Sequence, residues 1–130
     1  MVDLIALTDA WLKVMPQGEF DAFPGRVSPD LVLRLPFMPP GLPNEFRGRE
    51  KVQALLQQTA QGRTPLIFSD KVIRRTEDPE LTMTTCKAEA VMNNGKTYRN
   101  EYVILVRIRG DEVIEHVEYL NPLAIMAAAD

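Results

Sequence analysis

Hydrophobic positions in the first half of the chain recur at helical spacing. They predict an amphipathic helix over residues 3–15, with Asp3 placed to cap its start and Pro16 to end it. A short second helix is expected over 19–25, and a clear amphipathic helix over 49–61. The apolar positions of the first helix are Leu4, Leu7, Trp11, Leu12 and Met15.

The segment between these helices has a different pattern. Ser28-Pro29-Asp30 predicts a turn that leads into a strand over 31–35. Residues 36–48 then contain four prolines and two glycines, so we expect no regular element there. The loop also carries Phe37, Met38, Leu42 and Phe46. Such apolar content indicates an ordered loop, and we interpret 36–47 as the lid or mouth of a pocket.

From residue 65 the pattern changes to strands separated by turns. Asn93-Asn94-Gly95 is typical of a hairpin turn, and 123–129 is compatible with a short helix. The predicted strands are 66–75, 81–92, 97–109 and 112–120. Helices followed by an antiparallel meander predict an α+β fold. We therefore expect one α+β domain over 1–130, in which the helices cover one face of a curved antiparallel or mixed sheet.

The two longest strands indicate which faces are buried. Both faces of 97–109 are apolar at its centre, so both are expected to be covered. On the last strand, alternation places Ile114, His116, Glu118 and Leu120 on one face and Val113, Val117 and Tyr119 on the other. The face away from the helices has few partners within so small a domain. We therefore expect a homodimer through the sheet.

The candidate chemistry lies on the face that carries Glu118. A carboxylic acid against apolar walls is suited to general acid or base catalysis, so Glu118 and His116 are the candidate catalytic residues. Asn100 and Tyr102 are expected on the same face of the neighbouring strand, where they would bind a substrate oxygen. Lys87 and Glu89 could extend the site. The alternative is structural: Glu118 would pair with Lys87 or an arginine, and His116 would be a satisfied core group.

Composition narrows the possible partners and cofactors. A net charge of −3 gives no basic field for nucleic acid, and no run of 18 apolar residues exists to span a membrane. His116 is the only histidine, so we expect no metal site, and no nucleotide-binding motif suggests an organic cofactor. The N-terminal stretch lacks the features of a signal peptide and Cys86 is the only cysteine. Both observations favour a cytoplasmic protein.

Several motifs resemble one superfamily along nearly the whole chain. They are the proline-rich PFMPPGLP, FRGRE before a helix, YRNEY, and the terminal VEYLNPL. On these motifs the sequence resembles the nuclear transport factor 2-like superfamily, specifically its SnoaL-like branch, and is similar to the phenazine-biosynthesis proteins of that fold. The resemblance implies a cone-shaped α+β domain, a deep pocket and frequent dimers. It says less about the reaction, because the fold hosts many activities.

Two enzymes of the superfamily allow a comparison by position. Glu118 falls where limonene epoxide hydrolase keeps a catalytic aspartate, and Lys87-x-Glu89 could match its Arg-x-Asp pair. The hydrolase's water-holding tyrosine and asparagine fall on Leu33 and Leu35. The three catalytic groups of ketosteroid isomerase fall near Leu35, Trp11 and Ile104. The resemblance therefore argues against either mechanism. It makes Trp11, Leu35, Ile104 and Leu120 expected parts of an apolar, substrate-binding wall.

The function predicted from the sequence is that of a small-molecule pocket protein. We expect a cofactor-independent acid/base enzyme of the isomerase, cyclase or hydrolase type, acting on a hydrophobic cyclic or polyketide-like metabolite, with Glu118 as the general acid/base. Arg34 could face the same pocket, although a surface position is favoured. The alternative is a non-catalytic ligand-binding or scaffold dimer of the same fold. Adaptor work in transport or secretion is a third possibility with little support.

Overall fold

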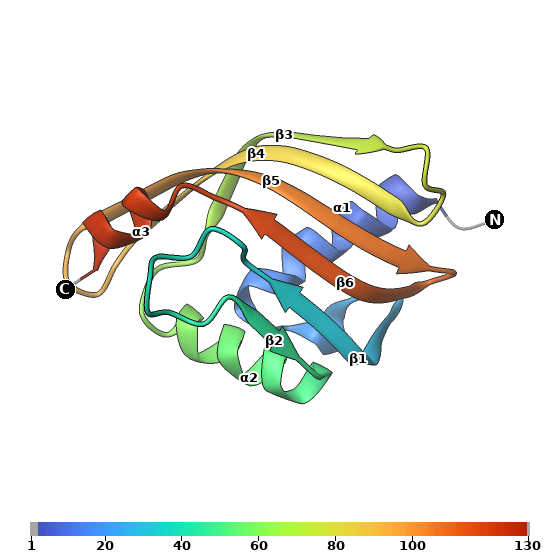
Figure 1. Cartoon of the computed structure of the whole chain (residues 1–130), viewed down its shortest axis with the longest axis horizontal. Coiled ribbons are helices and arrows are strands. Elements are labelled where there is room, and N and C mark those ends of the chain that lie inside the picture. Colours follow the sequence, from blue (N-terminus) through green and yellow to red (C-terminus); the bar gives the residue numbers. More distant parts are fainter. Residues whose placement is uncertain (1–2, 130) are drawn as a thin grey trace.

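The computed structural model describes residues 3–129 as a curved six-stranded sheet with its helices on one side (Figure 1). The helices are α1 (Leu4–Val14), α2 (Arg49–Ala60) and α3 (Pro122–Ala128), with 3-10 turns at Met15–Gln17 and Phe20–Ala22. The strands are β1 (Arg26–Arg34), β2 (Glu45–Arg47), β3 (Ile67–Arg75), β4 (Leu81–Val91), β5 (Thr97–Arg109) and β6 (Glu112–Tyr119). This arrangement confirms the predicted α+β cone.

The sheet has the strand order β2-β1-β6-β5-β4-β3. Strands β3 to β6 form the predicted antiparallel meander, while β1 pairs with β6 in parallel. Helices α1 and α2 pack on the inner, concave face, and α3 lies at the end of the sheet beside the β4–β5 turn (Figure 1). The helices therefore close one side of the cone.

The N-terminal helix forms as its sequence predicts. The Asp3 side chain accepts a hydrogen bond from the backbone N–H of Ala6, which satisfies one of the free amides of the first turn. Trp11 and Leu12 are almost fully buried against the sheet. None of the helices in the described residues is long and apolar enough to cross a membrane.

Three sequence-based expectations need correction. The segment 19–25 contains only a single 3-10 turn at Phe20–Ala22, because Pro24 and Gly25 follow at once. Strand β1 begins at Arg26 rather than at residue 31. The expected turn Ser28-Pro29-Asp30 is instead an irregularity within the strand, where the pairing with β6 shifts and Ser28 Oγ accepts from the amide of Asp30.

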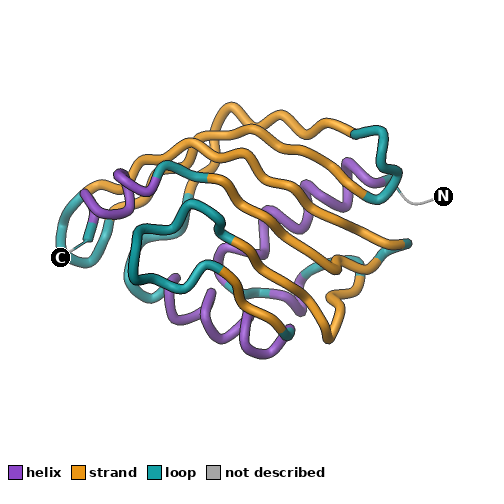
Figure 2. The backbone as a smooth tube through the Cα atoms, viewed as in Figure 1, coloured by secondary structure: helices purple, strands orange, loops and turns teal. Residues whose placement is uncertain are grey.

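The proline-rich segment is also more ordered than predicted. Residues 35–44 form the long loop of Figure 2, but Glu45–Arg47 then pairs antiparallel with β1 as strand β2. This pairing is possible because residues 44–48 contain no proline. The loop is held at its base by a backbone hydrogen bond from Leu35 to Asn44.

A bulge in β6 changes the predicted alternation. Arg107 lies opposite Glu115 but Ile108 lies opposite Val113, so Ile114 is an extra residue. Val113 therefore faces the core and is fully buried, whereas Ile114 leaves the face that it was expected to share with His116. Beyond the bulge, His116, Glu118 and Leu120 all face inward, as predicted.

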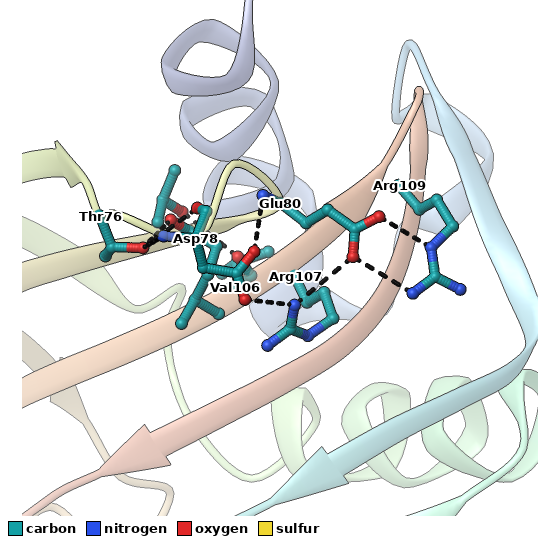
Figure 3. Close-up of polar contacts among 8 residues, drawn as sticks. Thr76, Asp78, Glu80, Val106, Arg107 and Arg109 are labelled. Atoms are coloured by element: carbon teal, nitrogen blue, oxygen red, sulfur yellow. Dashed lines mark hydrogen bonds and ion pairs between the residues drawn. The ribbon is translucent and has the colours of Figure 1, made fainter.

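The far end of the sheet is fixed by ion pairs (Figure 3). In the turn between β3 and β4, Asp78 accepts from Arg107 at 2.8 Å, and Glu80 receives two hydrogen bonds from Arg109 at 2.8 and 3.2 Å. Thr76 Oγ1 donates to backbone carbonyls within the same turn. These contacts tie the turn to β5, at the opposite end of that strand from α3.

Candidate functional site

A cavity of about 340 Å³ lies between the inner face of the sheet and the helices. This volume falls within the range of roughly 300–1,000 Å³ typical of small-molecule sites. Its walls come from all strands except β4, from α2 and α3, and from the 3-10 turn after α1 and the loop after β1. Most lining residues are apolar: Met15, Leu33, Leu35, Met38, Phe46, Leu55, Leu56, Leu66, Phe68, Met92, Leu120 and Ile125. Its few polar members are Glu118, Tyr98, Tyr102, Arg63 and Thr59.

Glu118 occupies the wall of this cavity on β6. It lies opposite Ile104 of β5, and its side chain is only 14% exposed. No described Lys or Arg lies within 4.0 Å of its carboxylate. Lys87 pairs instead with Asp70 on the other face of the sheet. The structural alternative of a Glu118–Lys87 or Glu118–arginine pair therefore finds no support in the geometry.

Two buried side chains stand behind Glu118. The indole Nε1 of Trp11 is 3.0 Å from Nδ1 of His116, and Nε2 of His116 is 3.1 Å from Oε1 of Glu118. An indole N–H can only donate, so Nδ1 must accept with its lone pair. The imidazole is then neutral, carries its hydrogen on Nε2 and donates it to Glu118. The chain Trp11–His116–Glu118 thus holds the carboxylate in one orientation.

His116 does not itself reach the cavity. It is 1% exposed and is not among the lining residues, and its ring lies 6.2 Å from the ring of Trp11. Trp11 packs in turn against Phe20 and Phe23, whose rings lie 5.1 and 5.5 Å from its own. The sequence placed His116 beside Glu118 as a second catalytic group. The structure places it underneath, where it can orient Glu118 but cannot touch a ligand.

Two tyrosines provide the hydroxyl groups of the cavity. The hydroxyl oxygens of Tyr98 and Tyr102 are 2.5 Å apart, and Asn100 Nδ2 donates to Tyr98 at 2.8 Å. Burial raises the pKa of both phenols, so both remain protonated at neutral pH. Only one of their two hydrogens is used between them. In either arrangement one O–H remains for a ligand.

Asn100 is fully occupied by contacts within the protein. Its Oδ1 accepts from the amides of Asn121 and Glu101, and its Nδ2 donates to the carbonyl of Asn121 as well as to Tyr98. No donor or acceptor is left for a substrate. Asn121 in turn caps α3 by accepting from Leu123. Asn100 therefore holds α3 over the end of the cavity and does not line it.

The structure does not bring Lys87 and Glu89 to the site. On β4 the even-numbered residues Cys86 and Ala88 face the core, so both charged side chains point to the outer face. There Lys87 pairs with Asp70 at 3.6 Å and Glu89 with Arg99 at 3.3 Å. The sequence correctly put them on one face of a strand but could not say which face.

The remaining predicted residues divide between wall and floor. Leu35, Leu120 and Tyr102 line the cavity, whereas Trp11 and Ile104 are fully buried beneath it. Arg34 lies at the surface, with Glu45 at 3.5 Å and Glu115 at 3.9 Å from its guanidinium. The surface position that the sequence favoured for Arg34 is the one observed.

Sequence reasoning missed one charged lining residue, Arg63. It follows Gly62 at the end of α2, where a lone cation resembles an ordinary solvated residue. The backbone of Arg63 pairs with that of Met92, beside the β4–β5 turn. This contact between distant segments positions Arg63 at the cavity. No local pattern in the sequence predicts that contact.

Cys86 and the described carboxylates give no sign of a metal centre. Burial raises the pKa of the Cys86 thiol to about 11, with the charge of Glu118 as a secondary cause. Cys86 is therefore a protonated core residue at neutral pH, not a ligand or nucleophile. Within residues 3–129 no three His, Cys, Asp or Glu side chains are grouped as a metal ion would require.

Comparison with known proteins shows which of them share this fold. No protein-family model matches the sequence. An uncharacterised PhzA/B-like protein of Pseudomonas aeruginosa is 25% identical over 118 residues, which cover 90% of this chain and 83% of that protein. A crystal structure of an NTF2-like protein from Burkholderia xenovorans superposes with a TM-score of 0.74 at 19% identity, over 98% of this chain and 95% of the other. The chain has the nuclear transport factor 2-like fold.

A second structure with this fold bears an enzyme name. The pinacolase BvnE from Penicillium brevicompactum superposes with a TM-score of 0.77 at 16% identity, over 95% of this chain and 89% of the other. The fold that the resemblance of the sequence motifs implied is thereby confirmed. At these identities the structural likeness establishes the fold only. The chemistry must be argued from the side chains.

Proposed function

We propose that this protein is a cofactor-independent acid/base enzyme acting on a hydrophobic, cyclic or polyketide-like metabolite, with Glu118 as its general base. The observation that carries the proposal is the chain Trp11–His116–Glu118, which ends at an apolar cavity. A buried histidine that donates to a carboxylate fixes its rotamer and leaves Oε2 for a substrate proton. The enzyme name of one structural neighbour supports catalysis over a scaffold role.

The lining side chains suit proton transfer next to a carbonyl group. Glu118 Oε2 would accept a proton from the carbon beside the carbonyl, and the electron pair of the C–H bond would move into the enolate. The free O–H of the Tyr98–Tyr102 pair would stabilise the enolate oxygen. In an unsaturated ketone, Glu118 would return the proton to the far carbon of the conjugated enolate, which completes an isomerisation. Alternatively, the enolate carbon would attack a second carbonyl of the same molecule and close a ring, and the alkoxide formed there would take the proton back from Glu118.

The test has a binding step and a chemical step. Hydrophobic cyclic ketones would be screened by thermal shift, and each ligand then followed by NMR in D₂O for exchange of the hydrogens beside its carbonyl. We expect wild-type protein to catalyse exchange and Glu118→Gln to bind the same ketone without catalysing it. The control is Glu115→Gln, which changes a carboxylate on the outer face of the same strand.

Two outcomes would contradict the proposal. Exchange that persists in Glu118→Gln would show that another group removes the proton. Ligands that bind wild-type protein without any exchange would favour the alternative function, a binding protein in which Glu118 only orients the ligand.

We also propose that two copies pair through the outer face of the sheet. The registers place Met83 beside Leu105 and Val103 beside Tyr119, which gives a continuous apolar area at the centre of that face. Val103 is 38% exposed there. Sedimentation should show a dimer in wild-type protein and a monomer in Val103→Lys. A wild-type monomer would contradict the proposal.

A further inference from the structure

Arg63 is a cation in the cavity wall, and no counterion for it is found among residues 3–129. No described carboxylate lies within 4.0 Å of its guanidinium, which donates one hydrogen bond, from Nη2 to the carbonyl of Pro16 at 3.3 Å. Its Nε is buried and has no partner. Since a guanidinium has five N–H donors, four of them have no protein partner in the described part of the chain, and the Nε–H among them is buried. A partly buried charge in this state is unfavourable unless something else pairs with it.

The two charges of the cavity act on the same pair of phenols. Arg63 and Glu118 both line the cavity that contains Tyr98 and Tyr102. Glu118 raises the pKa of each phenol and Arg63 lowers it, although burial dominates both shifts. The phenol pair is therefore within electrostatic reach of an anionic and a cationic side chain that do not pair with each other.

We propose that Arg63 is an anion-recognition residue and that the ligand of this cavity is a hydrophobic ring system bearing a carboxylate. The carboxylate would accept hydrogen bonds from the free N–H groups of the Arg63 Nη atoms. The apolar walls would enclose the ring system, whose reactive carbon would lie at Glu118. The inference rests on the proposed function for the position of the reactive carbon, but the binding of the carboxylate can be measured independently of catalysis.

The geometry of the cavity agrees with such a ligand. The wall is apolar except for the groups already named, so a ligand with a second charge elsewhere would be left without a partner. A carboxylate at Glu118 would be repelled, which fixes the orientation of the bound molecule. Arg63 therefore discriminates between acids and neutral compounds, while Glu118 decides which end of an acid enters first.

The test uses matched pairs of probes: 1-naphthoate and 2-naphthoate, each against its uncharged primary amide, by isothermal titration calorimetry at pH 7. Wild-type protein should bind at least one acid about tenfold more tightly than its amide, as one charge-assisted hydrogen bond would give. Arg63→Gln should remove this preference while keeping the affinity for the amide. Arg63→Lys should retain part of it.

The control variant is Arg49→Gln. Arg49 also donates to a backbone carbonyl, that of Val27 at 3.0 Å, but it does not line this cavity. Its preference for the acid should equal that of wild-type protein. Equal affinity of wild-type protein for acid and amide would overturn the proposal even if Arg63→Gln failed to fold, and so would a preference that survives in Arg63→Gln.

This result is distinct from the test of catalysis. If Glu118→Gln abolishes exchange and Arg63→Gln keeps the preference for acids, the proposed function stands and the role of Arg63 is wrong. If the acid preference depends on Arg63 but Glu118→Gln still catalyses exchange, the assignment of Glu118 is wrong and the recognition site stands.

Discussion

The indole Nε1 of Trp11 lies 3.0 Å from Nδ1 of His116, across 105 positions of sequence and between α1 and β6. This hydrogen bond determines which nitrogen of the imidazole carries the hydrogen, because the indole supplies a donor and nothing else. The opposite nitrogen must then donate to Glu118. The core residue Trp11 thereby orients the Glu118 carboxylate through His116, without contacting that carboxylate itself.

We predict that Trp11→Phe loosens this control. Without the indole donor, only the contact with Glu118 selects the Nε2–H tautomer, so the Nδ1–H tautomer is populated whenever that contact opens. In long-range ¹H–¹⁵N spectra at pH 8, wild-type protein should show the Nε2–H tautomer alone, and the variant a mixture. His116 is the only histidine, so its signals are unambiguous. Turnover of any ketone substrate should fall roughly 10- to 100-fold.

A matched control separates orientation from packing. Phe20→Leu also removes aromatic contact around Trp11 but leaves the indole–imidazole hydrogen bond in place. It should lower the unfolding temperature and keep the single tautomer. A mixture of tautomers in Phe20→Leu, or a single tautomer in Trp11→Phe, would show that the tautomer does not depend on the indole.

The tyrosine pair predicts a non-additive result. Tyr102→Phe leaves the Tyr98 hydroxyl, which still accepts from Asn100 and can donate its hydrogen to a ligand. Tyr98→Phe likewise leaves the Tyr102 hydroxyl. Each single variant should therefore lose less than about tenfold in kcat, whereas the double variant should lose roughly 100- to 1,000-fold, the range for removal of an oxyanion donor.

Steady-state kinetics of the three variants would check this coupling. The control is Tyr119→Phe, because Tyr119 lies on the outer face, where its ring meets that of Phe37 edge to face at 5.2 Å. Its kcat should not change. If one single variant lost as much as the double variant, only that hydroxyl would serve the reaction, and the interchangeable pair would be wrong.

Asn100 should matter for stability. Asn100→Ala would leave the Asn121 amide without its observed partner at the end of β6. It would also remove one of the two donors to the Asn121 carbonyl, which would keep the Ala124 amide. We expect the free energy of unfolding to fall by about 2–4 kcal/mol. Hydrogen exchange should accelerate at the Asn121 amide, and at α3, whose capping residue is Asn121.

Urea unfolding and amide exchange would measure both effects. Asn93→Ala is the control, since Asn93 also donates to a backbone carbonyl, that of Gln61 at 2.9 Å, but in an exposed turn. Asn93→Ala should lower the free energy of unfolding by much less than Asn100→Ala. An Asn100→Ala protein as stable as Asn93→Ala would contradict the structural role assigned to Asn100.

The alternation of the strands made much of the site predictable, but only where pairing is regular. Glu118 and Tyr102 share the inner face because β5 and β6 pair without interruption beyond the bulge. Before the bulge the prediction fails at Val113, because an inserted residue reverses the phase of every position that precedes it. Alternation along a strand shows which residues share a face, but it does not show which face is the inner one. For this reason Lys87 and Glu89 were assigned to the pocket.

Other features depend on contacts between distant segments. Asn100 was expected to bind substrate because an inward amide on a strand has the right chemistry, yet its contacts with Asn121, Glu101 and Tyr98 use that amide completely. Arg63 reaches the cavity through a backbone bridge to Met92. In both positions the residue type is informative, but its partner comes from a tertiary contact that local sequence does not encode.

The last prediction concerns pH and the turn between β3 and β4. A backbone hydrogen bond and Arg107 hold the pKa of Asp78 below its ordinary value of 3.8, and Arg109 holds that of Glu80 below 4.5. A lowered pKa in the folded state stabilises the protein above the unfolded pKa, and this stabilisation is lost as pH falls through the folded pKa. Arg109→Gln should therefore lower the urea midpoint at pH 7 but change it little at pH 2.5, where the carboxylates are protonating.

Arg75→Gln is the control, because no carboxylate partner is observed for Arg75 in the described part of the chain. The urea midpoint of this variant should follow that of wild-type protein at both pH values. An Arg109→Gln effect of equal size at pH 2.5 and pH 7 would show that the arginine acts through packing and not through its charge.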